Sequence, residues 1–241
     1  MPMSLRALIL ALLLAGAATA ALPESFTNLT VLPSDTPKDE LMDVMKSFST
    51  ALGVRCIHCH VQKTPGDYDS VDWASDELEP KKVARGMMKL VQSVNGDLLP
   101  DAGVKGHTVS CVTCHRGLTD PATLDEVLGK TIAAEGVDAA VAEYRDLRNL
   151  YYGSGSYDFG PGVLAGLARE RTELHQDVAG AEALLNLNVE THGDDPDAWI
   201  LRAQFLDRAD RRAEALADVR KALELAPGHR RAVDMLERLG G

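Results

Sequence analysis

The stretches Cys56-Ile57-His58-Cys59-His60 and Cys111-Val112-Thr113-Cys114-His115 decide the organisation of this chain. They contain all four of its cysteines, and in each a histidine directly follows the second cysteine. Each stretch reads C-x-x-C-H, the pattern that attaches a haem covalently. Two thiols three residues apart on one helical face can both bond one edge of a porphyrin, and the histidine one turn beyond can ligate the iron. We therefore predict two covalently bound haem c groups, attached through Cys56, Cys59, Cys111 and Cys114, with His60 and His115 as axial ligands.

Three other uses of paired cysteines fit this pattern less well. Zinc sites use C-x-x-C pairs, but here 51 residues separate the two pairs and each pair is followed by a histidine. A structural disulfide seldom joins cysteines so close together. A thioredoxin-like redox pair lies where a strand meets a helix, and no strand pattern precedes either motif.

Residues 1–20 have the three parts of a secretory signal peptide. A basic start with Arg6 leads into an apolar run from Ala7 to Leu14, and the segment ends in the small residues Ala18-Thr19-Ala20. The apolar run is shorter than the roughly 20 residues that cross a bilayer, although an uncleaved membrane anchor is the alternative. We expect an exported protein that is periplasmic, or else extracellular or at the cell surface.

The composition limits the classes of partner. The formal net charge is −11, with 25 Lys and Arg against 36 Asp and Glu, which argues against binding nucleic acid or anionic lipid. Aromatic residues make up only 5% of the chain, and alanine and leucine are abundant, which favours helices over sheets. The acidic surface can steer docking to basic partners, although solubility is the simpler interpretation.

A methionine-bearing amphipathic helix is predicted before each motif. The first follows Thr36 and Pro37 and ends at Gly53, and the second runs from Pro80 to Asn95-Gly96. Their apolar stripes are Leu41, Met45, Phe48 and Leu52 in the first helix, and Val83, Met87, Leu90 and Val94 in the second. Methionine or histidine is the usual sixth ligand of haem iron in an electron carrier. Met42 and Met88 lie one position away from the stripes.

The sequence around these helices resembles the cytochrome subunit of photosynthetic reaction centres and its shorter bacterial relatives. The similar stretch runs from Phe26-Thr27-Asn28-Leu29 and Val31-Leu32-Pro33 to Arg116-Gly117. Within it, one unit joins Met45-Lys46-Ser47-Phe48 to Gly53-Val54-Arg55-Cys56, and the next joins Val83-Ala84-Arg85-Gly86-Met87-Met88 to Val109-Ser110-Cys111. The resemblance implies a helix with a ligand methionine, a turn and a C-x-x-C-H helix in each unit. It places the ligands at Met45 and Met87, with Met88 as the alternative to Met87.

The chain departs from that family in the number of units. The family has four haem units, whereas this chain has two, so the resemblance implies paired haems but not photosynthesis. His107 is a conceivable iron ligand, but we expect it in a surface loop, and His58 should point away from the iron. Arg55, Arg85 and Arg116 are candidates to neutralise haem propionates, although a solvated charge is the simpler reading of each.

The second half of the chain has the pattern of a tetratricopeptide repeat. Between Pro196 and Pro227, the large, small and proline positions of that repeat are occupied by Trp199, Ala203, Leu206, Ala215, Val219, Ala222 and Pro227. Ala181 and Leu185 match one repeat earlier, after a less clear first helix at Gly162 to Leu174. We also expect a helix or helix pair at Thr131 to Leu150, a glycine-rich loop at 151–156 and a capping helix at Arg230 to Leu239. A generic bundle of helical hairpins is the alternative, and surface positions are expected for His175, His192 and His229.

The fold class predicted is therefore mainly α. Residues 21–119 form two helix/C-x-x-C-H haem units, and residues 120–241 form a tetratricopeptide-like array of about three helix pairs. We expect removal of residues 120–241 to leave both haem spectra unchanged.

The leading functional hypothesis is an electron-transfer protein rather than an enzyme. We expect its redox partner to be a protein, such as a membrane electron-transfer complex, and the helical repeats to serve protein docking or self-association. The alternative is a di-haem peroxidase-like enzyme with one open haem. A scaffold with vestigial haems is a third class, disfavoured by the two complete motifs.

Overall fold

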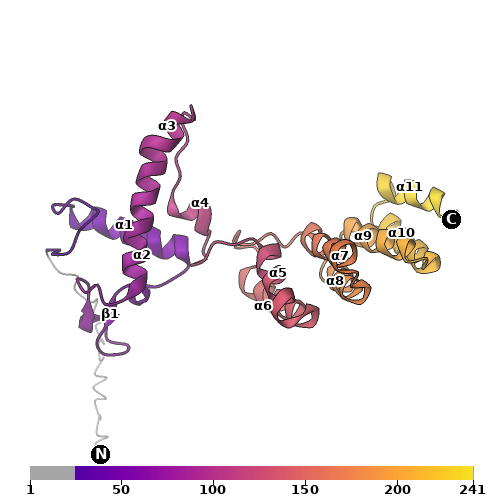
Figure 1. The fold of residues 1–241 in the computed structure, drawn as a ribbon, viewed down its shortest axis with the longest axis horizontal. Helices are drawn as coiled ribbons and strands as arrows, with labels where there is room; N and C mark the ends of the chain where they lie inside the picture. The colour runs from indigo at the N-terminus through magenta and orange to yellow at the C-terminus, as the bar shows by residue number, and fades with distance from the viewer. Residues whose placement is uncertain (1–24, 241) are drawn as a thin grey trace, which may run out of the picture. The chain divides into compact units, whose positions relative to one another are not determined.

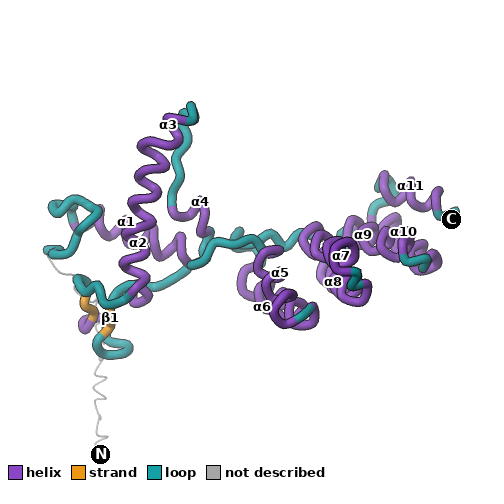
Figure 2. Tube along the Cα trace, in the orientation of Figure 1, coloured by secondary structure: helices purple, strands orange, loops and turns teal. Residues whose placement is uncertain are grey.

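The computed structural model describes residues 25–240, so the signal peptide predicted at residues 1–20 lies outside the described residues. Helices joined by loops make up this part of the chain, together with one small two-stranded sheet (Figures 1 and 2). The predicted mainly α fold is therefore confirmed. Within residues 25–240, no helix combines the length and the apolar character needed to cross a membrane.

The chain divides into two compact units, which we describe separately. The first, the N-terminal unit, comprises residues 25–49 and 54–110. The second, the helical unit, comprises residues 50–53 and 111–240. The second C-x-x-C-H motif thus lies in the helical unit, and the domain boundary at residue 119 stays a prediction.

Short elements surround two longer helices in the N-terminal unit. They are α1 (Lys38–Leu52), η1 (Cys56–His58), β1 (Val61–Gln62), η2 (Tyr68–Ser70), β2 (Val71–Asp72), α2 (Glu79–Ser93), η3 (Val94–Leu98) and α3 (Leu99–Asp101). Strands β1 and β2 are antiparallel, with Val61 opposite Asp72 and Gln62 opposite Val71. The predicted helices before the two motifs correspond to α1 and α2.

The predicted end of the second helix at Asn95-Gly96 is wrong. The helix passes through the π-helical turn η3 and continues as α3. Gly96 lacks the positive φ of a glycine that ends a helix, which Gly103 has instead at +75°. The Asn95 side chain bonds the loop that leads to Cys111: its Nδ2 donates to the Val109 carbonyl at 2.8 Å, and its Oδ1 accepts from the Val109 amide at 2.7 Å.

The helical unit is built from helix pairs. Its elements are α4 (Cys111–His115), α5 (Leu124–Glu135), α6 (Val137–Tyr151), α7 (Pro161–His175), α8 (Val178–Thr191), α9 (Pro196–Arg208), α10 (Arg212–Leu225) and α11 (Arg230–Arg238). Helices α5 and α6, α7 and α8, and α9 and α10 pack as successive pairs, and α11 packs on α10 (Figure 1). The segment predicted as a helix or helix pair at Thr131 to Leu150 is a pair that begins earlier, because Thr123 and Glu126 form a capping box before α5.

The tetratricopeptide-like positions form the core between these helices. Ala203, Ala215 and Ala222 are fully buried where α9 and α10 approach each other, and the small side chain of alanine allows that approach. Trp199 packs against the same cluster and donates its Nε1 proton to the Gly193 carbonyl at 2.9 Å. The first helices of successive pairs also contact each other, α5 with α7 and α7 with α9. The predicted helical repeat region is confirmed.

The expected surface position of His192 is wrong. Its side chain is buried beyond the end of α8, where Nδ1 lies 3.1 Å from the Asn188 carbonyl and Nε2 contacts the Phe159 carbonyl. The imidazole thus lies between the end of α8 and the segment before α7 and contacts a backbone carbonyl of each. His229 is half-buried against Asp197, whereas His175 is exposed as expected.

Candidate haem attachment sites

The first motif presents a histidine whose ring orientation is fixed by the fold. Cys56 to His58 form the short helix η1, and the His60 amide closes the turn onto the Cys56 carbonyl at 3.0 Å. The His60 Nδ1 lies 3.1 Å from the Trp73 carbonyl, and the two rings contact each other with centroids 5.2 Å apart. Since a carbonyl oxygen only accepts, Nδ1 carries the proton in this hydrogen bond, which leaves the Nε2 lone pair available for a metal.

The surroundings of His60 favour its neutral form. Burial lowers the pKa of His60, and the nearby Lys81 ammonium lowers it further. Burial also raises the pKa of the Cys59 thiol. A neutral imidazole is the form of histidine that binds iron.

The second motif is held by hydrogen bonds on its C-terminal side. Its histidine has the same arrangement as the first, with Nδ1 of His115 donating to the Leu118 carbonyl at 2.8 Å. Leu118 is buried, and the Ser156 hydroxyl from the glycine-rich loop donates to the Arg116 carbonyl at 2.7 Å. In both motifs, therefore, a backbone carbonyl orients the histidine so that Nε2 is available.

Two glycines allow the segment after the second motif to approach the end of α1. Gly53 and Gly117 both have positive φ, at +66° and +91°. The Gly117 amide donates to the Ala51 carbonyl at 2.8 Å. A Cβ atom on Gly53 would lie 2.3 Å from the Gly117 oxygen, closer than any real contact of that kind. Glycine at residue 53 is thus required by both its conformation and its neighbour.

The apolar side chains around the first unit suit a large apolar cofactor. Along α2, the stripe of Val83, Met87 and Leu90 is 55, 38 and 51% exposed, although these residues share one helical face. Among residues 25–110, the buried apolar side chains are Leu41, Ala51 and Val71. A core that small rarely stabilises a unit of this length without a cofactor, metal or disulfide. The donor set and this uncovered stripe therefore fit covalently attached haem.

The candidate methionines lie on the two predicted helices. Met45 is half-buried on α1, as are Met42 and Phe48. On α2, Met87 lies on the exposed apolar stripe, whereas Met88 is half-buried one position round. Their role as ligands stays a prediction.

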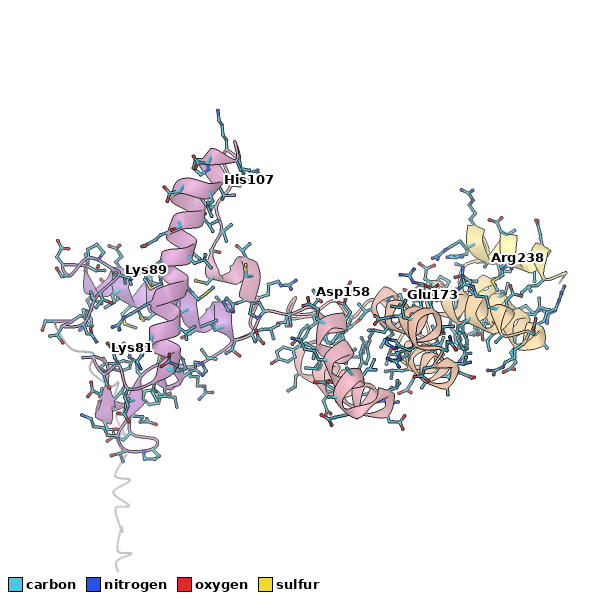
Figure 3. The ribbon with its side chains drawn as sticks, in the orientation of Figure 1. Lys81, Lys89, His107, Asp158, Glu173 and Arg238 are labelled. Carbon is cyan, nitrogen blue, oxygen red and sulfur yellow. The ribbon has the colours of Figure 1, made fainter. Side chains whose placement is uncertain are left out.

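The arginine and histidine candidates fall into two groups. Arg55, Arg116, His58 and His107 are exposed, and His107 lies in the loop beyond α3 (Figure 3). Arg85 is not a solvated charge: it pairs with Asp76 at 2.8 Å and donates to the Asn28 carbonyl at 3.0 Å. Hydrogen bonds from Arg85 and Asn28 hold the pKa of Asp76 well below its usual range.

Three residues that position the motifs escaped the sequence analysis. Asn95 holds the loop before Cys111, Trp73 supplies the acceptor for His60, and Lys81 donates to that same Trp73 carbonyl at 2.9 Å. Asn95 was interpreted as part of a helix end because a glycine follows it. The backbone carbonyl that accepts from His60 cannot be predicted from residue types, because every residue has a carbonyl.

A family model and several known proteins are similar to part of this chain. Residues 21–128 match the family described as the photosynthetic reaction centre cytochrome C subunit. The photosynthetic reaction center cytochrome c subunit of Thermochromatium tepidum is 35% identical over 96 residues, which are 39% of this chain and 21% of that protein. Cytochrome c-554 of Chloroflexus aurantiacus is 38% identical over 68 residues, which are 28% of this chain and 14% of that protein. The chain thus spans about a fifth or less of the length of these relatives.

The match confirms the predicted resemblance to reaction-centre cytochromes, and cytochromes of this class carry covalent haem c. Solved structures with similarity to the chain include the first TPR of Spaghetti (RPAP3) bound to an HSP90 peptide and the NMR structure of the first TPR domain of human RPAP3. The former is 23% identical with a TM-score of 0.32, and the latter 22% identical with a TM-score of 0.32. Each match covers 48% of this chain and 87% of the other.

Proposed function

We propose that this chain is an exported di-haem c-type cytochrome that transfers electrons in the periplasm or at the cell surface. The observation that carries the proposal is the shared arrangement of His60 and His115, each with Nδ1 held by a backbone carbonyl. That arrangement fixes an imidazole for metal binding and is unnecessary for a disulfide or a surface loop. A bound haem supplies one-electron chemistry.

The protein's own residues position and tune the two sites. The thiols of each motif would attach the cofactor, and the histidine after them would ligate its iron. Met45 and Met87 supply the opposite ligands in this proposal, because each lies on the apolar stripe of its helix. Thioether ligation raises the reduction potential relative to a second histidine, which suits an electron carrier working with oxidants.

Haem content and ligation are tested on the full chain, expressed with a cytochrome c maturation system. Intact mass should give two haems, and Cys56→Ala with Cys59→Ala should give one. Met45→Ala or Met87→Ala should lower one reduction potential and remove one sulfur-to-iron absorption band, whereas Met42→Ala should not. Two haems in the cysteine variant would contradict the attachment sites. A high-spin ferric fraction that reacts with peroxide would favour the peroxidase-like enzyme instead.

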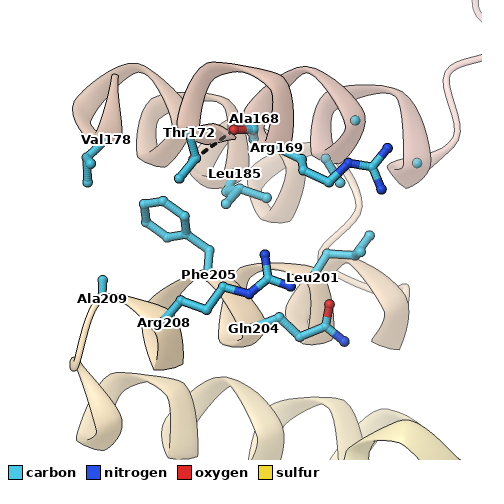
Figure 4. Close-up of a pocket in the computed structure, with 13 residues that line it drawn as sticks. Ala168, Arg169, Thr172, Val178, Leu185, Leu201, Gln204, Phe205, Arg208 and Ala209 are labelled. Atoms are coloured by element: carbon cyan, nitrogen blue, oxygen red, sulfur yellow. Dashed lines mark hydrogen bonds between the residues drawn. The ribbon is translucent and has the colours of Figure 1, made fainter. Parts of the chain in front are cut away.

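The second part of the proposal is that the helical unit docks a partner protein. A groove of about 340 Å³ lies between α7 and α9, with α8 behind it (Figure 4). Its apolar lining includes Leu185, Leu201 and Phe205, and the Phe205 ring points from α9 towards α7. On α7, Gly162 and Gly166 face this space, and a Cβ on either would meet nothing within 4 Å.

The charges at the groove favour an acidic partner segment. Arg169 and Arg208 line it and are exposed, and neither pairs with a carboxylate of the described residues. Arg171 and Arg202, in contrast, pair with Asp177 and Asp218. Two unpaired cations beside an apolar groove, in a chain of net charge −11, complement a partner segment that combines acidic and apolar side chains.

Fluorescence anisotropy with a short labelled peptide of Asp, Glu and Leu tests this docking site. We expect Arg169→Glu with Arg208→Glu to weaken binding about tenfold or more, and Gly166→Leu to weaken it by filling the groove. Arg220→Glu is the control, because Arg220 is an exposed cation on α10 outside the groove. Equal binding of a peptide with lysines in place of the acidic residues would contradict the proposal.

A further inference from the structure

One backbone carbonyl near the first motif accepts two hydrogen bonds. The Trp73 oxygen lies 3.1 Å from the His60 Nδ1 and 2.9 Å from the Lys81 Nζ. Lys81 also donates to the Ser75 carbonyl at 2.8 Å and pairs with Asp76 at 3.3 Å. Its side chain is only 12% exposed, and its hydrogen bond to the Trp73 carbonyl places the ammonium group beside the acceptor of His60.

The second motif differs from the first at this point. Its histidine donates to the Leu118 carbonyl at 2.8 Å, and the side-chain hydrogen bonds described for residues 25–240 bring no ammonium or guanidinium group to that oxygen. The neighbouring Arg116 is exposed. The two proximal histidines are therefore alike in their orientation but different in the strength of the acceptor that each one meets.

This difference acts on the histidine ligand. A proton donated from Nδ1 to a strong acceptor makes the imidazole a better electron donor, which favours ferric iron and lowers the reduction potential. The Lys81 ammonium group also donates to the Trp73 carbonyl oxygen, which makes that oxygen a weaker acceptor for the His60 Nδ1 proton. Among the side-chain hydrogen bonds described for residues 25–240, the Leu118 carbonyl accepts from His115 without a cation beside it, so this bond is not weakened in that way.

The charge of Lys81 acts in the same direction. A fixed positive charge disfavours the ferric state, which carries one more positive charge than the ferrous state. Asp76 offsets part of this field, but Arg85 also pairs with Asp76, so the three groups together keep one positive charge. Both effects raise the potential at the first site.

We propose that Lys81 is a positioning residue that raises the reduction potential of iron bound by His60 above that of iron bound by His115. This inference rests on the proposed function, since it concerns the order of potentials between two haem sites. With this order of potentials, an electron has a lower free energy on the first site than on the second. An electron donor is then expected to serve the second site and an acceptor the first.

Spectroelectrochemical titration of the full haem-loaded chain tests this inference. In Lys81→Gln, the higher of the two potentials should fall, with the ferrous-to-ferric ratio at fixed applied potential dropping about tenfold, equivalent to about 59 mV. The lower potential should not move. Lys81→Arg keeps the charge and a donor and should recover most of the shift. The matched control is Lys82→Gln, an exposed lysine on the same helix that pairs with Glu79 and should change neither potential.

The assignment of potentials uses the chain that lacks the first attachment site. Cys56→Ala with Cys59→Ala should retain the lower potential alone. Retention of the higher one, an unchanged potential in Lys81→Gln, or an equal shift in Lys82→Gln would each overturn the inference. Circular dichroism of each variant verifies that its helices are intact. Absence of haem by mass would contradict the proposed function itself, whereas two haems with unshifted potentials would contradict the role of Lys81 alone.

Discussion

Replacing Gly53 by alanine should loosen the contact between the end of α1 and the segment after the second motif. A Cβ at residue 53 would lie 2.3 Å from the Gly117 oxygen, so the two backbones must separate by about 1 Å to reach an ordinary contact. The Gly117 amide lies 2.8 Å from the Ala51 carbonyl, and the same movement would take that hydrogen bond beyond its normal range.

The expected loss of stability has two parts. Alanine at a φ of +66° costs about 1–2 kcal/mol relative to glycine. Loss of the Gly117 hydrogen bond and displacement of its carbonyl add about 1–2 kcal/mol. We therefore expect the free energy of unfolding to fall by about 2–4 kcal/mol in Gly53→Ala.

Gly153→Ala is the matched control, because it isolates the conformational part. Gly153 has a φ of +79° in the same unit, and a Cβ there would meet nothing within 4 Å. It should lose about 1–2 kcal/mol only. Urea unfolding of the haem-loaded chain gives the two free energies, and amide hydrogen exchange at Gly117 reports the contact directly. Equal destabilisation of the two variants, with unchanged exchange at Gly117, would refute the reasoning.

Three further predictions concern other contacts. The carboxyl pKa of Asp76 is depressed in the folded chain, so its stabilising effect is present above the ordinary carboxyl pKa of about 4 and is lost as the pH falls towards the folded value. Urea unfolding across pH should show less acid-dependent loss of stability in Asp76→Asn than in the parent, and parallel profiles would contradict this. Ser156→Ala removes a hydroxyl that donates to the Arg116 carbonyl, and should cost about 1 kcal/mol and shift the haem potential of the second site but not of the first; equal shifts at both sites would count against it. Gly166→Ala should stabilise the chain by about 1 kcal/mol, because nothing lies within 4 Å of the added methyl group in α7, and a lower thermal midpoint would show that the space is not free.

Local sequence signals predicted most of the helical unit. Ala203, Val219 and Ala222 occur at helical spacing and are all fully buried, so the pattern of small and large residues specified the packing of α9 against α10. The helix α7 at Pro161–His175 also lies where the weaker signal from Gly162 to Leu174 placed it. Periodicity is sufficient here because each pair buries its face mainly against its neighbours in the chain.

The wrong structural predictions concern residues whose side chains contact groups far away in the sequence. Asn95 before Gly96 reads as a helix end, but its side chain bonds Val109, and the helix continues. His192 reads as a surface residue, but it meets the Phe159 carbonyl 33 residues earlier. Sequence periodicity cannot predict such contacts, because these groups come together only when the chain has folded.

At the candidate haem sites, too, features that depend on local spacing are predictable from the sequence, whereas those that depend on distant residues are not. The C-x-x-C-H motifs predict the attachment residues, since the chemistry of attachment depends on spacing within five residues. The orientation of His60 depends on the Trp73 carbonyl, 13 residues away, and on Lys81 beyond it. Sequence alone therefore predicts that two haems bind, whereas the order of their potentials requires the structure.

The contacts of the second motif change the expectation that the two halves of the chain are separable. The Ser156 hydroxyl bonds the Arg116 carbonyl and so ties the segment after His115 to the glycine-rich loop, and Cys111 to His115 belong to the helical unit. Removal of residues 120–241 would take away the Ser156 hydroxyl, while the contacts of His60 with Trp73 and of Trp73 with Lys81 would remain. The loss should therefore fall on the second site and spare the first. A partner that docks on the helical unit then binds the part of the chain that also positions His115, the site at which we expect electrons to enter.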